Sequence, residues 1–229
     1  MELEPVFRNL KHLNLSNCNI SEWGDVLQTA RLWPFIQNLG LQDNEISQLT
    51  EVNCNEIFRN LKELDLHRTK IMDFDQVCKL GNLKTLISLN LMENGIEQIK
   101  LPDCDYGEKL GIFVALEQLN LMYNPIWNEC DVFNELDKLP KLKTLSKSSH
   151  LKSNFDEMFS NAVAIISNLK ILNKMEIKCE ERRGAEYDIW KKYAVEYMVA
   201  NKSNETLHDF YKKHRTYPDI VKSKCDADL

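Results

Sequence analysis

An eleven-residue sequence motif recurs along this chain at a nearly constant interval. The stretch LKELDLHRTKI begins at Leu61, and LISLNLMENGI begins at Leu86. Further copies begin at residues 10, 36 and 116, and a decayed copy begins at residue 142, so the successive steps are 26, 25, 25, 30 and 26. In the five good copies Leu or Ile fills places one, four, six and eleven, while the places between them vary. Because only the apolar places recur, the pattern predicts one structural unit stacked several times.

This period and spelling are typical of the leucine-rich repeat. The L-x-L segment of each copy puts two Leu side chains on one side of a short strand and the residues between them on the other. We therefore expect an α/β fold in which residues 1–153 form a solenoid of about six repeats, with parallel strands on its concave face. A 229-residue chain of this kind need not divide into two globular domains.

Asn at place nine of several copies has a predicted structural role. Asn44, Asn94 and Asn124 stand where the chain turns off the strand, and their amides can satisfy backbone groups of neighbouring repeats. In the first copy Cys18 occupies this place, so we expect a buried turn residue there.

The connections between strands carry a second pattern, with Ile followed at threefold spacing by Trp, Phe or Leu and then by Val. This spacing predicts a helix or 3₁₀ turn covering the convex side, with Trp23 and Phe74 in the core. The fourth repeat departs from the others, because KLPDCDYGEKLGIFVA lengthens it between Ile99 and Leu116. We expect this insertion to be a loop on the rim.

Residues 154–200 are expected to cap the end of the solenoid. Phe155, Phe159, Val163 and Ile166 recur at helical spacing, and the chain then returns to an L-x-x-L-N spelling at Leu169.

A second, amphipathic helix is expected from Cys179 to Met198, packed on the cap. Its apolar stripe consists of Ala185, Ile189, Tyr193, Ala194, Tyr197 and Met198. We interpret its EERR run as a solvated face. Residues 201–229 are expected to be a tail or linker toward a missing C-terminal domain.

Composition excludes several classes of protein. There is no run of about eighteen apolar residues and no apolar signal segment in MELEPVFRNLKHL, so we expect no membrane association and a cytosolic location. Seven cysteines lie at least 24 residues apart without a C-x-x-C pair, which favours structural free thiols over a metal site. Residues 1–150 hold 15 Lys and Arg against 22 Asp and Glu, a balance that disfavours nucleic acid as a partner.

The outward places of the strands form the candidate binding surface. The candidate contact residues are Glu63, Asp65, His67, Met92, Met122 and Tyr123. Glu63 and Asp65 resemble a catalytic acid pair, but no nucleophile, phosphate loop or spaced histidines accompany them, so we expect neither an enzyme nor a bound cofactor. The acids are either a solvated stripe or a docking surface for a partner protein, which solenoid faces commonly bind. The two methionines and the tyrosine are either adaptable contacts or local packing.

A resemblance to a known family covers about 210 residues. Residues 166–192, ISNLKILNKMEIKCEERRGAEYDIWKK, are similar to the segment that closes the leucine-rich domain of tubulin-folding cofactor E. The stretches LNLSNCNISEW at residues 13–23 and FYKKHRTYPDI at residues 210–220 are similar to that family at matching places. The most specific part is the ERR-x-AE stretch formed by Glu181, Arg182, Arg183, Ala185 and Glu186. The repeats by themselves are equally typical of regulatory and scaffold subunits of other complexes.

The resemblance implies a chaperone role without catalysis. The solenoid would hold α-tubulin while other tubulin-folding cofactors deliver and release β-tubulin, in the cytoplasm and in association with the cytoskeleton. The glycine-dense CAP-Gly domain and the ubiquitin-like domain typical of this family are not found here, and the chain has seven glycines. The chain is therefore expected to be a fragment, an isoform or a reduced member. A leucine-rich scaffold subunit of another cytosolic or nuclear complex is the alternative.

Overall fold

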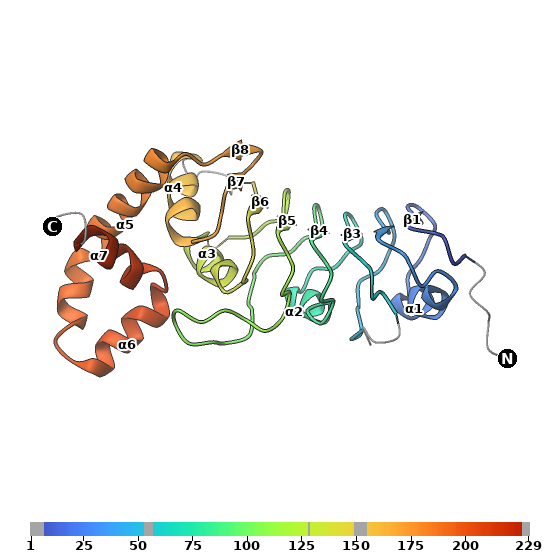
Figure 1. Ribbon diagram of the computed structural model, residues 1–229, viewed down its shortest axis with the longest axis horizontal. Helices are drawn as coiled ribbons and strands as arrows, with labels where there is room; N and C mark the ends of the chain where they lie inside the picture. The colour runs from blue at the N-terminus through green and yellow to red at the C-terminus, as the bar shows by residue number, and fades with distance from the viewer. Residues whose placement is uncertain (1–6, 53–56, 128, 149–154, 226–229) are drawn as a thin grey trace.

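A computed structural model describes residues 7–52, 57–127, 129–148 and 155–225. In this part of the chain eight short strands form one sheet in chain order, β1 to β8, along an elongated molecule (Figure 1). The strands are β1 His12–Asn14, β2 Asn38–Gly40, β3 Glu63–Asp65, β4 Ser88–Asn90, β5 Gln118–Asn120, β6 Thr144–Ser146, β7 Ile171–Leu172 and β8 Met175–Glu176. Neighbouring strands from β1 to β7 are parallel, which confirms the predicted leucine-rich-repeat solenoid.

The sequence period sets the register of the sheet. Leu64 of β3 lies opposite Leu39 of β2 on one side and Leu89 of β4 on the other, so the residue at place four always meets its own counterpart. Each of these three side chains is 1% exposed. The repeated Leu places therefore stack into one continuous core, as expected for a solenoid in which each repeat contacts its neighbours.

The asparagine ladder is confirmed. The Asn44 side chain accepts hydrogen bonds from the backbone N–H groups of Cys18 and Ile20, at 3.0 Å each, and donates to the Leu15 and Leu41 carbonyls. Corresponding bonds surround Asn94 and Asn124.

The prediction for Cys18 is wrong, because its side chain is exposed. Asn44, in the second repeat, is 2% exposed, whereas Cys18 lies in the first repeat. Among the described residues, no preceding repeat stacks on that side to cover it.

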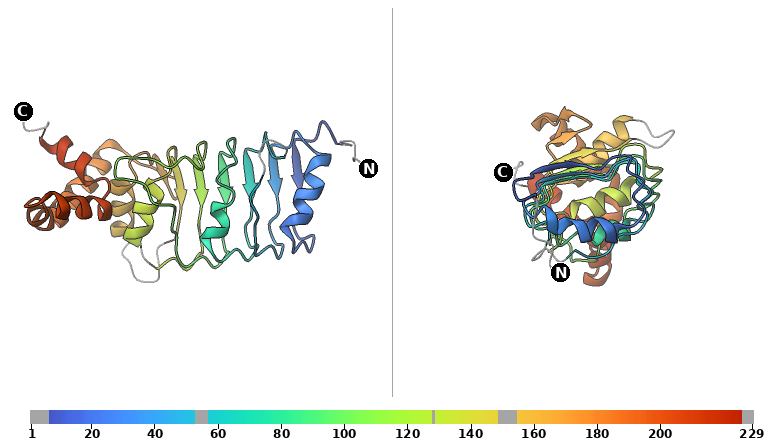
Figure 2. Two further views of the ribbon diagram at one scale, coloured as in Figure 1. Left: turned by 90° about the horizontal axis from the view of Figure 1, so that it is seen from below. Right: turned by 90° about the vertical axis from the view of Figure 1, so that its right-hand side faces the viewer.

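Short helices connect the strands on the side opposite the sheet, as Figure 2 shows. They are α1 Trp23–Thr29, the 3₁₀ helix η1 Ala30–Leu32, α2 Phe74–Cys78 and α3 Glu129–Asp137. Trp23 and Phe74 are 2% and 4% exposed, which confirms their place in the core. In α2 the carboxylate of Asp73 accepts the Asp75 N–H at 2.9 Å and caps the first turn.

The predicted cap is present as α4, Phe155–Ile165, followed by β7 and the antiparallel strand β8. Val163 is fully buried, together with Met158. Phe155 begins this helix, and its side chain is 43% exposed. Met158, one turn later, is fully buried.

Helix α5, Cys179–Ala200, packs against α4 of the cap, as expected, and continues to the C-terminal helices (Figure 1). The interpretation of its EERR run as a solvated face is wrong for Arg182. The Arg182 guanidinium donates hydrogen bonds to the carbonyls of Val163 and Leu169, which lie near and just beyond the end of α4. The Val163 carbonyl belongs to the last turn of α4, where carbonyls lack intrahelical partners, so Arg182 satisfies one of them. Met198 also departs from the predicted apolar stripe, because it is 61% exposed.

Residues 204–225, placed in the predicted tail, contain two helices, α6 Asn204–Lys213 and α7 Tyr217–Cys225. Arg215, between them, is 5% exposed and donates to the carbonyls of Cys104, Asp105 and Glu108 at 2.8 to 2.9 Å. The insertion in the fourth repeat is therefore more than a rim loop, because it anchors the C-terminal helices to the solenoid.

The structure describes the thiols of four cysteines. Cys18 and Cys179 are exposed, Cys78 and Cys104 are half-buried, and all four are free. Burial, reinforced by the nearby Asp75 carboxylate, raises the pKa of the Cys78 thiol to about 11. Cys54 lies outside the described residues. Over the described ranges, none of the helices combines the length and apolar character that crossing a bilayer requires.

Candidate protein-binding surface

The sheet presents one long polar surface, here called the strand face. In β1 to β6 the central Leu points into the core, and the residues on either side of it point the other way. The N-terminal half of the strand face contains a hollow of about 500 Å³. Its lining is mostly polar and includes His12, Asn14, Asn38, Gln42, Glu63, Asp65, Ser88 and Asn90.

Glu63 and Asp65 both line this hollow, but their environments differ. The Glu63 carboxylate accepts a hydrogen bond from the Asn38 side-chain amide of the preceding strand. Asp65 accepts the backbone N–H of His67 at 3.0 Å, which fixes the turn at the end of β3. Equivalent bonds join Asn14 to Ser16, Asn90 to Met92 and Asn120 to Met122, at 2.9 to 3.2 Å. Asp65 therefore has a structural role that Asn performs in other repeats.

His67, Met92 and Met122 occupy place seven of three consecutive repeats and so form one row. The backbone N–H of Arg68 donates to the Met92 carbonyl, and that of Glu93 donates to the Met122 carbonyl, each at 3.0 Å. All three side chains of the row are half-buried. Within the described residues, Nε2 of His67 is buried without a hydrogen-bond partner. The exposed parts of the two methionines in this row can therefore provide an apolar contact, whereas Nε2 of His67 is not accessible to a partner.

A rim of exposed residues runs beside this row at place eight. Asp43, Arg68, Glu93 and Tyr123 all have left-handed backbone conformations, with φ between 54° and 58°. Arg68 lies 3.1 Å from the Asp43 carboxylate and 3.9 Å from that of Glu93. Tyr123 is 63% exposed, so its ring is available to a partner. The structure thus brings the six predicted residues onto the strand face and its rim.

Sequence reasoning missed two exposed apolar residues farther along the same connections. Met72 and Trp127 stand at place twelve of their repeats and are 63% and 56% exposed. Other repeats have Ser47 and Glu97 at this place, so comparing the copies place by place would have found the departure. Exposed Trp and Tyr side chains are typical anchors of protein interfaces.

The carboxylates of Glu63 and Asp65 are held by contacts within the fold. Within the described residues there is no group of three or more His, Cys, Asp and Glu side chains that could hold a metal ion. Glu63 accepts a hydrogen bond from the Asn38 amide and Asp65 accepts one from a backbone N–H, so both carboxylates have structural partners.

The sequence of this chain is similar to proteins named tubulin-specific chaperone E from several animals. Tubulin-specific chaperone E of Drosophila melanogaster is 65% identical over 222 residues, which cover 96% of this chain and 42% of the relative. The protein of the same name from Xenopus laevis is 35% identical over 232 residues, covering 96% of this chain and 43% of the relative. That of Rattus norvegicus is 36% identical over 198 residues, covering 86% and 37%.

The resemblance to the tubulin-folding cofactor E family is confirmed. The chain spans about two-fifths of the length of these cofactor E relatives. No protein-family model matches it. Among solved structures, an internalin from Listeria monocytogenes str. 4b F2365 aligns with 78% of this chain and 46% of its own, at 19% identity and a TM-score of 0.45.

Proposed function

We propose that this chain is a tubulin-binding chaperone module that holds α-tubulin during assembly of the α/β-tubulin heterodimer. The proposal rests on 65% identity, over 96% of the chain, to a protein named tubulin-specific chaperone E. In this proposal the chain carries out no catalysis, and other tubulin-folding cofactors deliver and release β-tubulin. The protein acts in the cytoplasm, in association with the cytoskeleton.

The contact with α-tubulin is proposed to involve the strand face from β3 to β5. Glu63 and Asp65 supply negative charge, His67 and the two methionines Met92 and Met122 supply the half-buried row, and Tyr123 supplies an exposed ring. This combination resembles an interface in which aromatic anchors carry most of the binding energy and charges set orientation and association rate. Repeat solenoids commonly use such extended surfaces to bind macromolecules.

The proposal is tested by capture of purified α/β-tubulin on the immobilised chain. Glu63→Lys should weaken capture, and Tyr123→Ala should weaken it further, because the ring is both large and exposed. Asp188→Lys is the matched control, since it makes the same change of charge at an exposed position of α5 away from the strand face. Asp65 should be changed to Asn rather than Lys, because Asn keeps the acceptor for the His67 N–H.

The wild-type interaction should also weaken with added salt, because exposed charges are screened over about 8 Å at physiological ionic strength. Equal capture by Glu63→Lys, Tyr123→Ala and Asp188→Lys would remove the strand face from the contact. Failure of the wild-type chain to capture tubulin would reject the tubulin proposal for this chain. A leucine-rich scaffold subunit of another cytosolic or nuclear complex would then be the better interpretation.

A further inference from the structure

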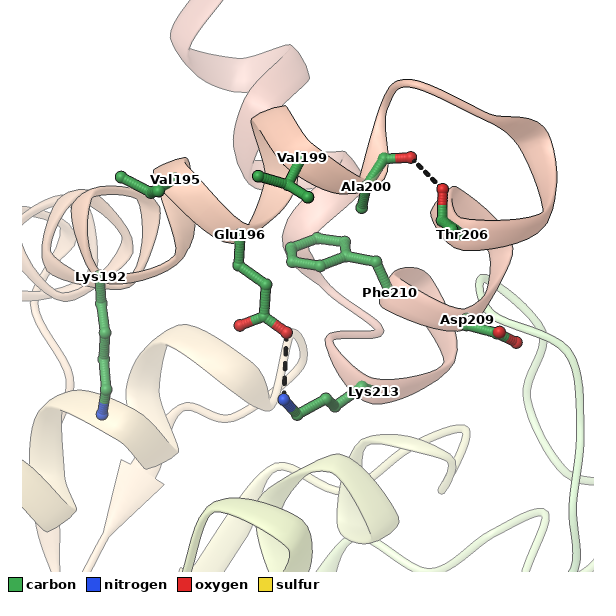
Figure 3. Close-up of a pocket in the computed structure, with 9 residues that line it drawn as sticks. All are labelled: Lys192, Val195, Glu196, Val199, Ala200, Thr206, Asp209, Phe210 and Lys213. Carbon is green, nitrogen blue, oxygen red and sulfur yellow. Dashed lines mark hydrogen bonds and ion pairs between the residues drawn. The ribbon is translucent and has the colours of Figure 1, made fainter.

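The helices that follow the solenoid form a groove that contains no residue of the strand face. It lies between α5 and α6 and has a volume of about 710 Å³ (Figure 3). Phe210 and Ala200 form its base and are 4% and 8% exposed. Val195 and Val199 line it from α5 and are 69% and 59% exposed. One helical turn therefore presents two apolar side chains to solvent beside an apolar base.

The base of the groove is held rigidly by an aromatic cluster. The Phe210 ring packs against His214, Tyr217 and Tyr197, with ring centroids 4.7, 5.1 and 5.7 Å apart. At the connection between the two helices, the Thr206 hydroxyl donates to the Ala200 carbonyl at 2.7 Å (Figure 3). The groove is thus formed before any partner arrives, which lowers the entropic cost of binding.

Charges at the groove give it a direction. Figure 3 shows Lys192 and Asp209 at opposite ends of the row of lining side chains. Between them, the Glu196 carboxylate lies 3.1 Å from the Lys213 ammonium, so these two charges largely offset each other. Lys192 also lies 3.7 Å from the Glu157 carboxylate of α4, but both side chains are exposed, and an exposed pair of this kind adds little stability, so an acid of a partner can replace Glu157. A complementary partner therefore has an apolar centre, negative charge toward Lys192 and positive charge toward Asp209.

We propose that this groove binds an amphipathic helix of a partner protein. Side chains at i, i+3 or i+4 and i+7 of such a helix form an apolar ridge that packs into the space between two helices. Helices favour acids in the first turn and bases in the last turn, so the partner helix lies with its first turn over Lys192 and its last turn over Asp209. This binding site is separate from the strand face and does not depend on tubulin capture.

The test uses a fluorescent sixteen-residue peptide titrated with the full 229-residue chain. The peptide is helical, has Leu at i, i+4, i+7 and i+11, carries Glu in its first turn and Lys in its last turn, and is followed by anisotropy. We expect saturable binding that Val199→Asp weakens by at least about tenfold, because a carboxylate would be buried against Leu side chains. A peptide of the same composition with its Leu residues dispersed should not bind.

Met198→Asp is the matched control, because Met198 is an exposed apolar residue of α5 that does not line the groove. It should leave the dissociation constant within about twofold, in line with ordinary surface substitutions. Lys192→Glu should weaken binding by about two- to fivefold, as expected for an exposed charge pair. The proposal is overturned if Val199→Asp and Met198→Asp bind the peptide equally, or if the dispersed peptide binds as tightly as the amphipathic one. Thermal melts should show that Val199→Asp stays folded, since both valines are already in contact with water.

Discussion

The two ends of the solenoid have similar sequences and very different surroundings. At the N-terminal end Leu13, Leu15 and Ile20 of the first repeat are only half-buried and line an apolar hollow of about 760 Å³. At the C-terminal end Leu142 and Leu145 of the last copy are fully buried. Strand β7 continues the sheet there, and α4 follows β6 in the chain and packs against α3 and α5. The recurring Leu and Ile residues thus point toward the core, but they are fully buried only where a neighbouring element packs against them.

The largest expected effect is a loss of stability when the Leu at place four is changed to Ala in the third repeat, compared with the same change in the first repeat. Leu64→Ala should reduce the free energy of unfolding by about 2 to 5 kcal/mol, because it leaves a cavity in a closely packed core. Leu13→Ala, at the same place of the first repeat, should cost about 1 kcal/mol, since that side chain already contacts water and removes less buried area. Urea unfolding followed by circular dichroism measures both. Equal losses would show that the first repeat is covered as well as the third.

The next largest effect is a loss of stability at the C-terminal end of the solenoid, where α4 covers the last repeat. Arg182→Ala removes the charged hydrogen bonds to the carbonyls of Val163 and Leu169 and should cost about 1.5 to 3 kcal/mol. Arg183→Ala is the control, because Arg183 is an exposed neighbour on the same helix, and its effect should stay within about 0.5 kcal/mol. If the two variants melt alike, the contact of Arg182 with the end of α4 contributes little to closing the solenoid.

The period of the sequence predicted the parts of the fold that depend on neighbouring repeats. The register of Leu64 between Leu39 and Leu89 and the bonds of Asn44 follow from places that recur every twenty-five or so residues. It also predicted that the Glu63 side chain points outward on the strand face. These predictions succeed because each internal repeat lies between two repeats of the same pattern.

Predictions failed where a contact joins segments that share no period. Arg215 bonds the insertion at Cys104, 111 residues away, and nothing in the local spelling of either segment indicates this. Met198 was assigned to an apolar stripe by spacing alone, but the stripe turns toward solvent near the end of α5. The sequence suggested that Asp65 is a functional acid. Its hydrogen bond from the His67 backbone N–H depends on the conformation of the turn, which the sequence pattern does not indicate.

Among the described residues no element covers the N-terminal end of the solenoid, here called the open end, so we expect the chain to associate with itself at high concentration. Phe7 is 52% exposed beside the apolar hollow, and uncovered ends of solenoids favour association. Phe7→Lys should lower the association seen by light scattering. Phe35→Lys is the control, because Phe35 is 51% exposed but does not line the hollow. Val6, next to Phe7 in the sequence, lies outside the described residues. A wild-type chain that stays monodisperse at every concentration would contradict this view of the open end.

The smallest expected effect is a pH dependence confined to the C-terminal end. Burial lowers the pKa of His214, and the adjacent Lys213 adds to this, while the Glu196 carboxylate opposes it. The folded state therefore favours the neutral ring, which packs against Tyr193 with centroids 4.0 Å apart. In the unfolded chain His214 becomes protonated as the pH falls through about 6.5, so the unfolded state gains protons first and the free energy of unfolding decreases below that pH.

The urea concentration at the midpoint of unfolding should consequently decrease between pH 7.5 and pH 5.5. His214→Phe keeps a ring in this place without a titrating group and should show a smaller fall, whereas His12→Asn, which changes an exposed histidine at the open end, should behave like the wild type. An unchanged pH dependence in His214→Phe would assign the loss of stability to other groups.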